Sequence, residues 1–439
     1  MKEKKAMNHS TLSEPQAPAR GCRTDRQAPG RGLIKFASPV LVVAAIGGIL
    51  WVSAGDLNPP PGAIQPTNRV QLNAQAITLP FTINQPGSYV LTSNLTGVSG
   101  QDGIIIEADD VTLDLNGFAL IGVAGSLDGV AVPAARTNLA VRRGTVRDWG
   151  GNGVDGANAT NSQFEHLRAS GNGANGIRVG AGGTVTNCTV RLNGSRGISV
   201  SSGSTVTDCT ARENGGDGIN ANSGSTVTNC TAQGNGEDGI DVFNSCTVVN
   251  CTAEGNTSDG IEAGEGCTIT NCTAANNTFD GITTSIGCTV SGCTVKDNMD
   301  DGISVTTGCT LQGCTVYFSG DNGIIVINSC TIQGCTVSFN TGDGIQASGD
   351  CRIIGNTCDS NGAGGGDGAG IHTISFDNRI EGNNVTDNDR GIDVDVAGNF
   401  IVKNTASGNG NDYVIVNGND VGTIQVSPVG AGAWDNFRF

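Results

Sequence analysis

The stretch CTVVNCTAEGNTSDGIEAG, residues 246–264, decides the fold of this 439-residue chain. Its Gly-Ile pair recurs every 21 residues without insertion or deletion, and nine glycines mark it: Gly176, Gly197, Gly218, Gly239, Gly260, Gly281, Gly302, Gly323 and Gly344. A strict repeat of this kind is typical of a solenoid in which each repeat forms one coil stacked on the coil before it. The fixed period also gives every position of the repeat an inward or an outward direction.

Three short strands are expected in each coil. The position of Val248 is aliphatic in every repeat, so strand alternation sends it inward and sends the flanking threonines outward. The corner at Asn250 holds only Asn, Asp or Gly across the repeats, which indicates a left-handed backbone with positive φ. A Cys-Thr strand and a Gly-Ile-x-Val strand complete the coil. We therefore predict an all-β parallel β-helix solenoid of 21-residue coils, about fifteen in number.

The first part of the chain differs from the repeats. Basic side chains precede an apolar run, 37–54, which ends in the small-residue pattern Val52-Ser53-Ala54 that suits signal peptidase. We expect 1–54 to be an export signal and the protein to be secreted or held at the cell surface; an uncleaved membrane anchor is the alternative. The remaining boundaries are a linker at 55–69, an N-terminal cap at 70–102, the parallel β-helix at 103–417 and a C-terminal cap at 418–439.

The chain is acidic, with a formal net charge of −17. Residues 1–54 hold eight of its 24 basic and three of its 41 acidic side chains, so the remainder carries −22. Such a surface repels nucleic acid and anionic membranes. We expect no nucleic-acid partner, membrane contact only through an uncleaved N-terminal segment, and a monomer. The charge suits divalent cations and neutral or cationic polymers.

The repeat, together with the coil GIIIEADDVTLDLNGFALIG at 103–122, resembles the right-handed parallel β-helix proteins of the pectate-lyase-like superfamily, many of them secreted by bacteria. The resemblance implies a right-handed solenoid that binds or processes polysaccharide along its side. If the protein is an enzyme, the resemblance implies a polysaccharide lyase or a glycoside hydrolase. However, the paired-Asp motif of polygalacturonases, the Arg-x-Pro-x-x-Arg strip of pectate lyases and the Asp-Pro-His of alginate epimerases are absent. A non-catalytic structural or adhesin-like surface protein is the alternative.

Two cysteine columns and one asparagine column follow the repeat. Both cysteine columns have inward parity, and we interpret them as structural, buried free thiols that act as small apolar groups. Disulfides in some coils and metal binding are the alternatives. The asparagines, from Asn172 to Asn361, are expected to form a hydrogen-bonded ladder along the axis. The cysteine columns are Cys188, Cys209, Cys230, Cys251, Cys272, Cys293, Cys314 and Cys335, and Cys246, Cys267, Cys288, Cys309, Cys330 and Cys351.

The residue before each Gly-Ile pair is acidic in a run of coils. Carboxylates stacked on neighbouring strands could hold Ca²⁺, which takes six to eight oxygen ligands. The alternative is that each Asp caps its own turn through a backbone N–H. The calcium candidates are Asp238, Asp241, Asp259, Glu262 and Asp280.

Two histidines fall within the repeats. His166 falls on the left-handed corner and is expected to be a turn residue. His372 occupies an outward strand position just after 361–370, where the strict period is interrupted by five residues. Asp393 should occupy the same position one coil later, with Asp395 beyond it. We take His372, Asp393 and Asp395 as candidate catalytic residues; a solvated histidine beside a glycine loop is the alternative.

Overall fold

The computed structural model describes residues 69–362 and 368–439, so the expected export signal and nearly all of the expected linker lie outside it. The described residues form short strands joined by turns, with no helix. Accordingly, no helix in these two ranges is long and apolar enough to cross a bilayer.

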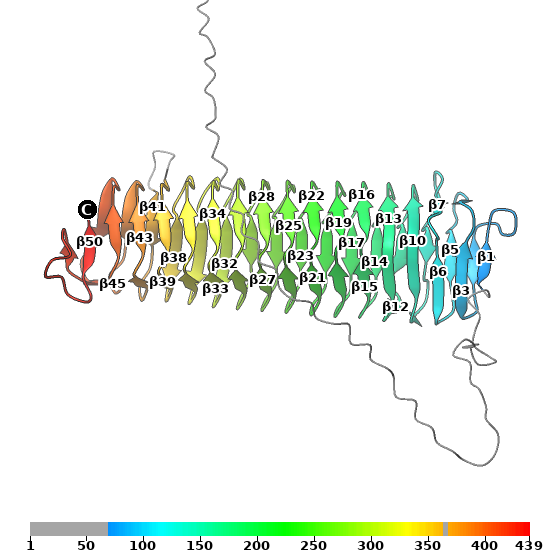
Figure 1. Cartoon of the computed structure of the whole chain (residues 1–439), viewed down its shortest axis with the longest axis horizontal. Helices are drawn as coiled ribbons and strands as arrows, with labels where there is room; N and C mark the ends of the chain where they lie inside the picture. The colour runs from blue at the N-terminus through cyan, green and yellow to red at the C-terminus, as the bar shows by residue number, and fades with distance from the viewer. Residues whose placement is uncertain (1–68, 363–367) are drawn as a thin grey trace, which may run out of the picture. The chain divides into compact units, whose positions relative to one another are not determined.

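The strands stack coil upon coil in one continuous array, shown in Figure 1. One face of the solenoid is a 16-stranded parallel sheet to which each coil gives one strand. Its strands are β2 (Phe81–Ile83), β5 (Ile104–Ile106), β8 (Val130–Ala131), β11 (Val154–Gly156), β14 (Ile177–Val179), β17 (Ile198–Val200), β20 (Ile219–Ala221), β23 (Ile240–Val242), β26 (Ile261–Ala263), β29 (Ile282–Thr284), β32 (Ile303–Thr307), β35 (Ile324–Asn328), β38 (Ile345–Gly349), β41 (Ala369–Thr373), β44 (Arg390–Val394) and β47 (Asn411–Ile415).

A second sheet of 32 strands forms the rest of the wall, and two further strands, β9 (Arg136–Thr137) and β12 (Ala159–Thr160), pair separately. In the repeats each coil gives the large sheet two strands. The first of each pair is β15 (Thr184–Thr186), β18 (Thr205–Thr207), β21 (Thr226–Thr228), β24 (Thr247–Val249), β27 (Thr268–Thr270), β30 (Thr289–Ser291), β33 (Thr310–Gln312), β36 (Thr331–Gln333), β39 (Arg352–Ile354), β42 (Arg379–Glu381) or β45 (Phe400–Val402). The second is β16 (Thr189–Arg191), β19 (Thr210–Arg212), β22 (Thr231–Gln233), β25 (Thr252–Glu254), β28 (Thr273–Ala275), β31 (Thr294–Lys296), β34 (Thr315–Tyr317), β37 (Thr336–Ser338), β40 (Thr357–Asp359), β43 (Asn384–Thr386) or β46 (Thr405–Ser407).

Less regular strands complete the large sheet at both ends of the array. In β10 (Ala140–Arg147) and β13 (Gln163–Ser170) the two strands of a coil are fused into one. The N-terminal strands are β1 (Val70–Leu72), β3 (Gly87–Leu91), β4 (Leu95–Thr96), β6 (Val111–Asp114) and β7 (Ala119–Ile121), and the C-terminal ones are β48 (Asp420–Val421), β49 (Ile424–Gln425) and β50 (Asn436–Arg438). Phe81 of β2 pairs with Ile104 of β5, so 70–102 already contributes a strand to the 16-stranded sheet.

Neighbouring coils pair in register at the period of the sequence. Val185 pairs with Val206, and Ile198 pairs with Ile219, each 21 residues on. All four are fully buried, and the corresponding side chains of the other repeats continue one core along the axis. The predicted parallel solenoid with 21-residue coils is therefore confirmed. Because each coil gives one strand to the 16-stranded sheet, there are sixteen such coils among the described residues, against about fifteen expected.

The corners differ from the prediction in number. Asn187 has φ 53°, and the predicted left-handed corner is found in every repeat. However, each coil has three left-handed corners rather than one, because the columns of Leu192 and Gly203 also have positive φ. The second column holds Phe318 and Phe339 with φ 58° and 56°. Sequence reasoning missed it because bulky residues are strained in this region; their side chains point outward, and the two rings stack with centroids 5.4 Å apart.

The asparagine column explains the glycine of the Gly-Ile pair. Asn256 Nδ2 donates to Asn277 Oδ1 at 2.9 Å, and its backbone N–H donates to the same oxygen at 3.0 Å. The predicted amide ladder is thus confirmed. A Cβ added at Gly239 would lie 2.6 Å from Asn256 Nδ2 and 2.6 Å from the carbonyl oxygen of Gly260. No other residue fits such a close approach of backbone and amide.

The cysteine columns are buried and contain no disulfide within the described residues. Their inward orientation is confirmed, but the thiols are not merely apolar filling. The Cys188 N–H donates to Cys209 Sγ at 3.5 Å, just as amide oxygens accept in the asparagine ladder. After Cys335 the column continues as Asn356, whose Oδ1 accepts from the Cys335 N–H at 2.9 Å. Cys358, which lies outside both columns, is also fully buried, and burial raises the pKa of its thiol, so this thiol is neutral.

Candidate functional site

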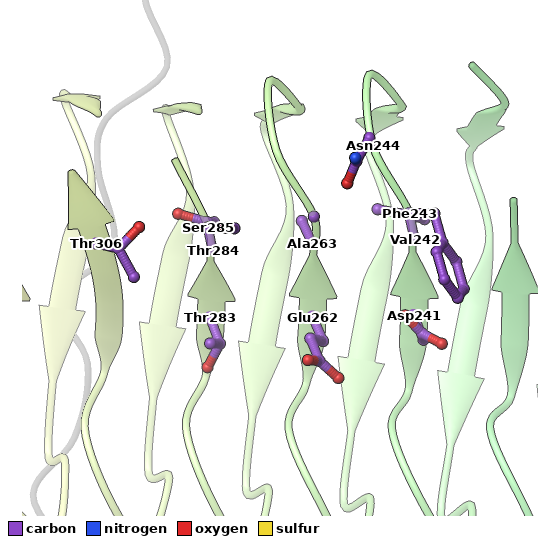
Figure 2. A pocket seen from close by; sticks show the side chains of 11 residues that line it. Asp241, Val242, Phe243, Asn244, Glu262, Ala263, Thr283, Thr284, Ser285 and Thr306 are labelled. Atoms are coloured by element: carbon purple, nitrogen blue, oxygen red, sulfur yellow. The ribbon is translucent and has the colours of Figure 1, made fainter. Parts of the chain in front are cut away.

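The outer face of the 16-stranded sheet carries the polar side chains that the repeat directs outward. Asp241, Glu262 and Thr283 are paired in register on β23, β26 and β29. Figure 2 shows them in a row, one on each of three neighbouring strands. Strand alternation places them outside because the flanking Ile and Val, Ala or Thr residues of each strand point into the core.

A second acidic column, formed by the residues that precede the Gly-Ile pairs, runs beside this row. Asp238 Oδ1 accepts from the Asp259 N–H at 2.8 Å, and Asp259 Oδ1 accepts from the Asp280 N–H at 2.9 Å. The same contact continues to Asp301. The alternative reading, in which each Asp caps its own turn, was therefore right about capping but wrong about the turn. Each carboxylate caps the turn of the next coil, because it leans along the solenoid axis.

Burial and neighbouring carboxylates raise the pKa of acidic side chains on this face. Desolvation raises the pKa of Asp280 to about 7, and the neighbouring carboxylates of Asp259 and Asp301 add to the effect. Desolvation, followed by the hydrogen bond to Asp238, raises the pKa of Glu262 to about 7. Arg196, whose Nε lies 2.8 Å from Asp217 Oδ2, is one of the few cations here. The face is therefore acidic but partly protonated near neutral pH.

A hollow of about 460 Å³ lies where this face meets the following turns. Its lining includes Asp241, Glu262 and Thr283, with Phe243 and Thr306 at its margin, as Figure 2 shows. The side chain of Phe243 is exposed. The Thr306 hydroxyl makes no hydrogen bond among the described residues. The hollow thus combines carboxylates, hydroxyls and an aromatic ring.

The structure brings the three candidate catalytic residues together. His372 on β41 pairs in register with Asp393 on β44, as the sequence predicted. His372 Nε2 lies 3.2 Å from Asp395 Oδ2, and the Arg390 guanidinium contacts Asp393 Oδ2. A second hollow of about 430 Å³ reaches this cluster, lined by His372 and by carboxylates of the coils before it.

Asp343 is the member of this site that sequence reasoning did not assign to it. Its Oδ2 lies 2.8 Å from His372 Nδ1, so the imidazole is held between two carboxylates. Asp343 Oδ1 also accepts from the Ala369 N–H at 2.7 Å. The signal was present in the sequence, because Asp343 belongs to the acidic column before Gly-Ile. The sequence did not show that the carboxylates of this column point along the solenoid axis and so contact the neighbouring coil.

The charges around His372 determine what the ring can do. Burial alone would lower its pKa, but the bonds to Asp343 and Asp395 raise it to about 9. At neutral pH the ring is therefore an imidazolium, which can donate a proton but cannot accept one. His166, in contrast, lies at a left-handed corner with φ 53°, as expected of a turn residue.

The acidic groups compact enough to hold a metal ion overlap little with the predicted calcium set. Within the described residues, ligand atoms lie within 4.8 Å of one another in two groups: His372, Asp393 and Asp395, and Asp280, Asp300 and Asp301. Of the five calcium candidates, Asp280 alone belongs to such a group. Asp241 and Glu262 instead line the first hollow.

The fold defines the class of protein, a parallel β-helix with a polar, acidic face. The family model described as "Right handed beta helix region" matches residues 88–257, 227–311 and 306–427. The chain therefore belongs to this family, and the right-handed solenoid expected from the sequence is confirmed. No curated protein is significantly similar in sequence.

Solved structures with a similar architecture include three polysaccharide-acting proteins. The Azotobacter vinelandii mannuronan C-5 epimerase AlgE6 A-module is 14% identical over 73% of this chain and 90% of that one, with a TM-score of 0.45. The periplasmic alginate epimerase AlgG is 12% identical over 74% and 84%, with a TM-score of 0.42. The catalytic domain of a GH87 α-1,3-glucanase is 15% identical over 75% and 71%, with a TM-score of 0.38. At these identities and TM-scores the likenesses carry no information about activity.

Proposed function

We propose that this protein binds polysaccharide along the face of the 16-stranded sheet. The observation that supports this proposal is the hollow beside β23, β26 and β29 (Figure 2). There Asp241, Glu262 and Thr283 offer hydrogen-bonding groups at the spacing of neighbouring strands, about 4.8 Å. Phe243 adds an exposed ring beside them. A polymer lying along the solenoid axis would meet an outward side chain at the same register position of each successive coil, with a hydrogen-bonding group on β23, β26, β29 and β32.

The charge of the face indicates the kind of polysaccharide. Acidic residues occupy this face from Asp217 to Asp343, and partly protonated carboxyls can both donate and accept hydrogen bonds. A polyanionic chain would be repelled, whereas a neutral or cationic chain would not. We therefore propose a neutral or amine-bearing polysaccharide as the ligand.

We further propose that binding takes place outside the cytoplasm, with 1–54 as the export signal. The burial of all fifteen described cysteines is compatible with an oxidising compartment, because thiols sealed in the core do not reach an oxidant. Direct sequencing of the N-terminus of the exported protein would test the signal. A mature chain that begins near residue 55 supports it, and an intact Met1 favours the membrane anchor.

A polysaccharide binding assay with the full chain tests the central proposal. We expect Phe243→Ala to weaken binding up to tenfold, since ring contacts contribute about 0.5–1.5 kcal/mol. Glu262→Gln, which removes a charge in the same hollow, should change the affinity as well. Glu254→Gln is the matched control, because Glu254 lies on β25 of the other sheet. Equal effects of Glu254→Gln and Glu262→Gln would place the ligand elsewhere.

Two alternatives remain open to the same assay. If the polymer is cleaved as well as bound, His372 is the predicted proton donor, and His372→Ala should abolish the release of products. Activity that survives this substitution would remove His372, Asp393 and Asp395 from the reaction. If no polysaccharide binds, the proposal is wrong and the structural or adhesin-like alternative stands.

A further inference from the structure

The side chains around His372 form a cluster of groups that can bind a metal ion. Four ionisable side chains from three successive coils meet there: Asp343, His372, Asp393 and Asp395. Asp393 is 1% exposed, although it carries a carboxylate. A buried carboxylate needs a cation, and Arg390 contacts one of its oxygens. We propose that His372, Asp393 and Asp395 together bind a divalent transition-metal ion of the zinc class.

The orientation of the imidazole supports this assignment. A metal-binding histidine usually donates the N–H of its second ring nitrogen to a carboxylate, which fixes the ring. Asp343 Oδ2, 2.8 Å from Nδ1, fills this role, and it leaves Nε2 facing Asp395 at 3.2 Å. Asp343 is itself held by Gln346 Nε2 at 3.1 Å and by the Ala369 N–H. The ring is therefore positioned before any ion arrives.

The donor set selects the kind of ion. His372, Asp393 and Asp395 each have a ligand atom within 4.8 Å of the others, a separation that a small adjustment of the side chains closes around one ion. One imidazole nitrogen and two carboxylates suit zinc, manganese or cobalt rather than Ca²⁺, which prefers six to eight oxygens. The adjacent hollow of about 430 Å³ leaves room for water or a ligand group to complete the coordination.

The balance of charges also favours a divalent ion. Asp343, Asp393 and Asp395 carry three negative charges, and Arg390 offsets one of them. A divalent ion offsets the two charges that remain. An imidazole nitrogen binds a metal ion only without its proton, so any proton on Nε2 passes to solvent when the ion binds.

Zinc titration of the full chain tests the proposal. The chain should carry the substitutions His9→Gln and Cys22→Ser, which remove two zinc-binding side chains outside the described residues. We expect one Zn²⁺ to bind, His372→Gln to abolish this binding, and Asp395→Asn to weaken it at least tenfold. The Asp395 side chain is 54% exposed, so Asp395→Asn will not disturb folding. Asp377→Asn, which changes an exposed carboxylate in the coil of His372, is the control and should change nothing.

Two further readouts separate ligation from a structural role. Cobalt absorption should show a nitrogen ligand in the parent chain and lose it in His372→Gln. Asp343→Asn should weaken binding by roughly 10–100-fold while the cobalt spectrum keeps its nitrogen ligand, because Asp343 positions the ring without touching the ion. Zinc binding that persists unchanged in His372→Gln, that is lost in Asp300→Asn instead, or that is absent from the parent chain would overturn the proposal.

Discussion

The asparagine ladder has one gap, and filling it should stabilise the solenoid. At residue 319 the column holds serine in place of asparagine. The Ser319 N–H still donates to Asn340 Oδ1 at 2.9 Å, but its hydroxyl is buried without a hydrogen-bond partner among the described residues. One coil earlier, Asn298 Nδ2 reaches only the Ala274 carbonyl, at 3.3 Å. The change Ser319→Asn restores the missing amide.

The gain can be worked out from the intact coils. There each amide accepts two bonds from the asparagine of the previous coil and donates one to the next, as Asn277 does at 2.9 to 3.0 Å. Three new bonds at about 0.5–1.5 kcal/mol each, less about 1 kcal/mol for ordering the side chain, give a net gain of about 0.5–3.5 kcal/mol. An asparagine side chain at residue 319 has room, because Gly302 lies beside it just as Gly239 lies beside the amide of Asn256.

Thermal unfolding and hydrogen exchange measure this gain. The midpoint temperature of unfolding should rise. The Asn298 N–H, which has no hydrogen-bond partner in the described parts of the chain, should become protected from exchange with solvent. Ser338→Asn, a partly exposed serine on β37, is the matched control and should leave both unchanged. A lower midpoint, or an Asn298 N–H that exchanges as before, would refute the reasoning about the ladder.

Three further predictions concern charge, thiols and calcium. Burial raises the pKa of Asp217 to about 6 from 3.8, so protonation stabilises the folded state below that pH, and this stability is lost as the pH rises through 6. The free energy of unfolding of Asp217→Asn should therefore rise relative to that of the parent chain between pH 4 and 7, by about 1–2 kcal/mol after solvent screening. A difference that is constant with pH would contradict this. A thiol reagent should label none of the fifteen described cysteines in the folded protein and all of them in denaturant, and prompt labelling of the folded chain would exclude the buried ladders. Calcium at the acidic columns should appear as heat in calorimetry and as a higher melting temperature, both reduced by Asp280→Asn; no heat and no shift would remove the calcium prediction.

Much of the fold was predictable because a strict period fixes direction. The inward position of Val248, the positive φ of Asn187 and the amide ladder all follow from alternation and from residue chemistry. The second left-handed corner was missed because Leu192, Phe318 and Phe339 argue against that backbone region, although Gly234 and Gly255 in the same column favour it.

The candidate site was predicted in part. Register placed His372 beside Asp393, since strand pairing follows the repeat. The contact with Asp343 was missed because it depends on how far an outward side chain leans along the axis, which a repeat pattern does not contain. The same lean explains why the acidic column caps the next coil rather than its own turn. The repeat thus gives direction, while contacts between coils require the structure.

Hydrogen exchange in the presence of a bound oligosaccharide tests the central claim most directly. The account predicts protection of the turns that follow β23, β26 and β29, where Phe243 and Ser285 border the hollow, and no change in the strands β24, β25, β27 and β28 of the other sheet. Protection confined to the other sheet, or bound ligand with no protection at this hollow, would contradict it.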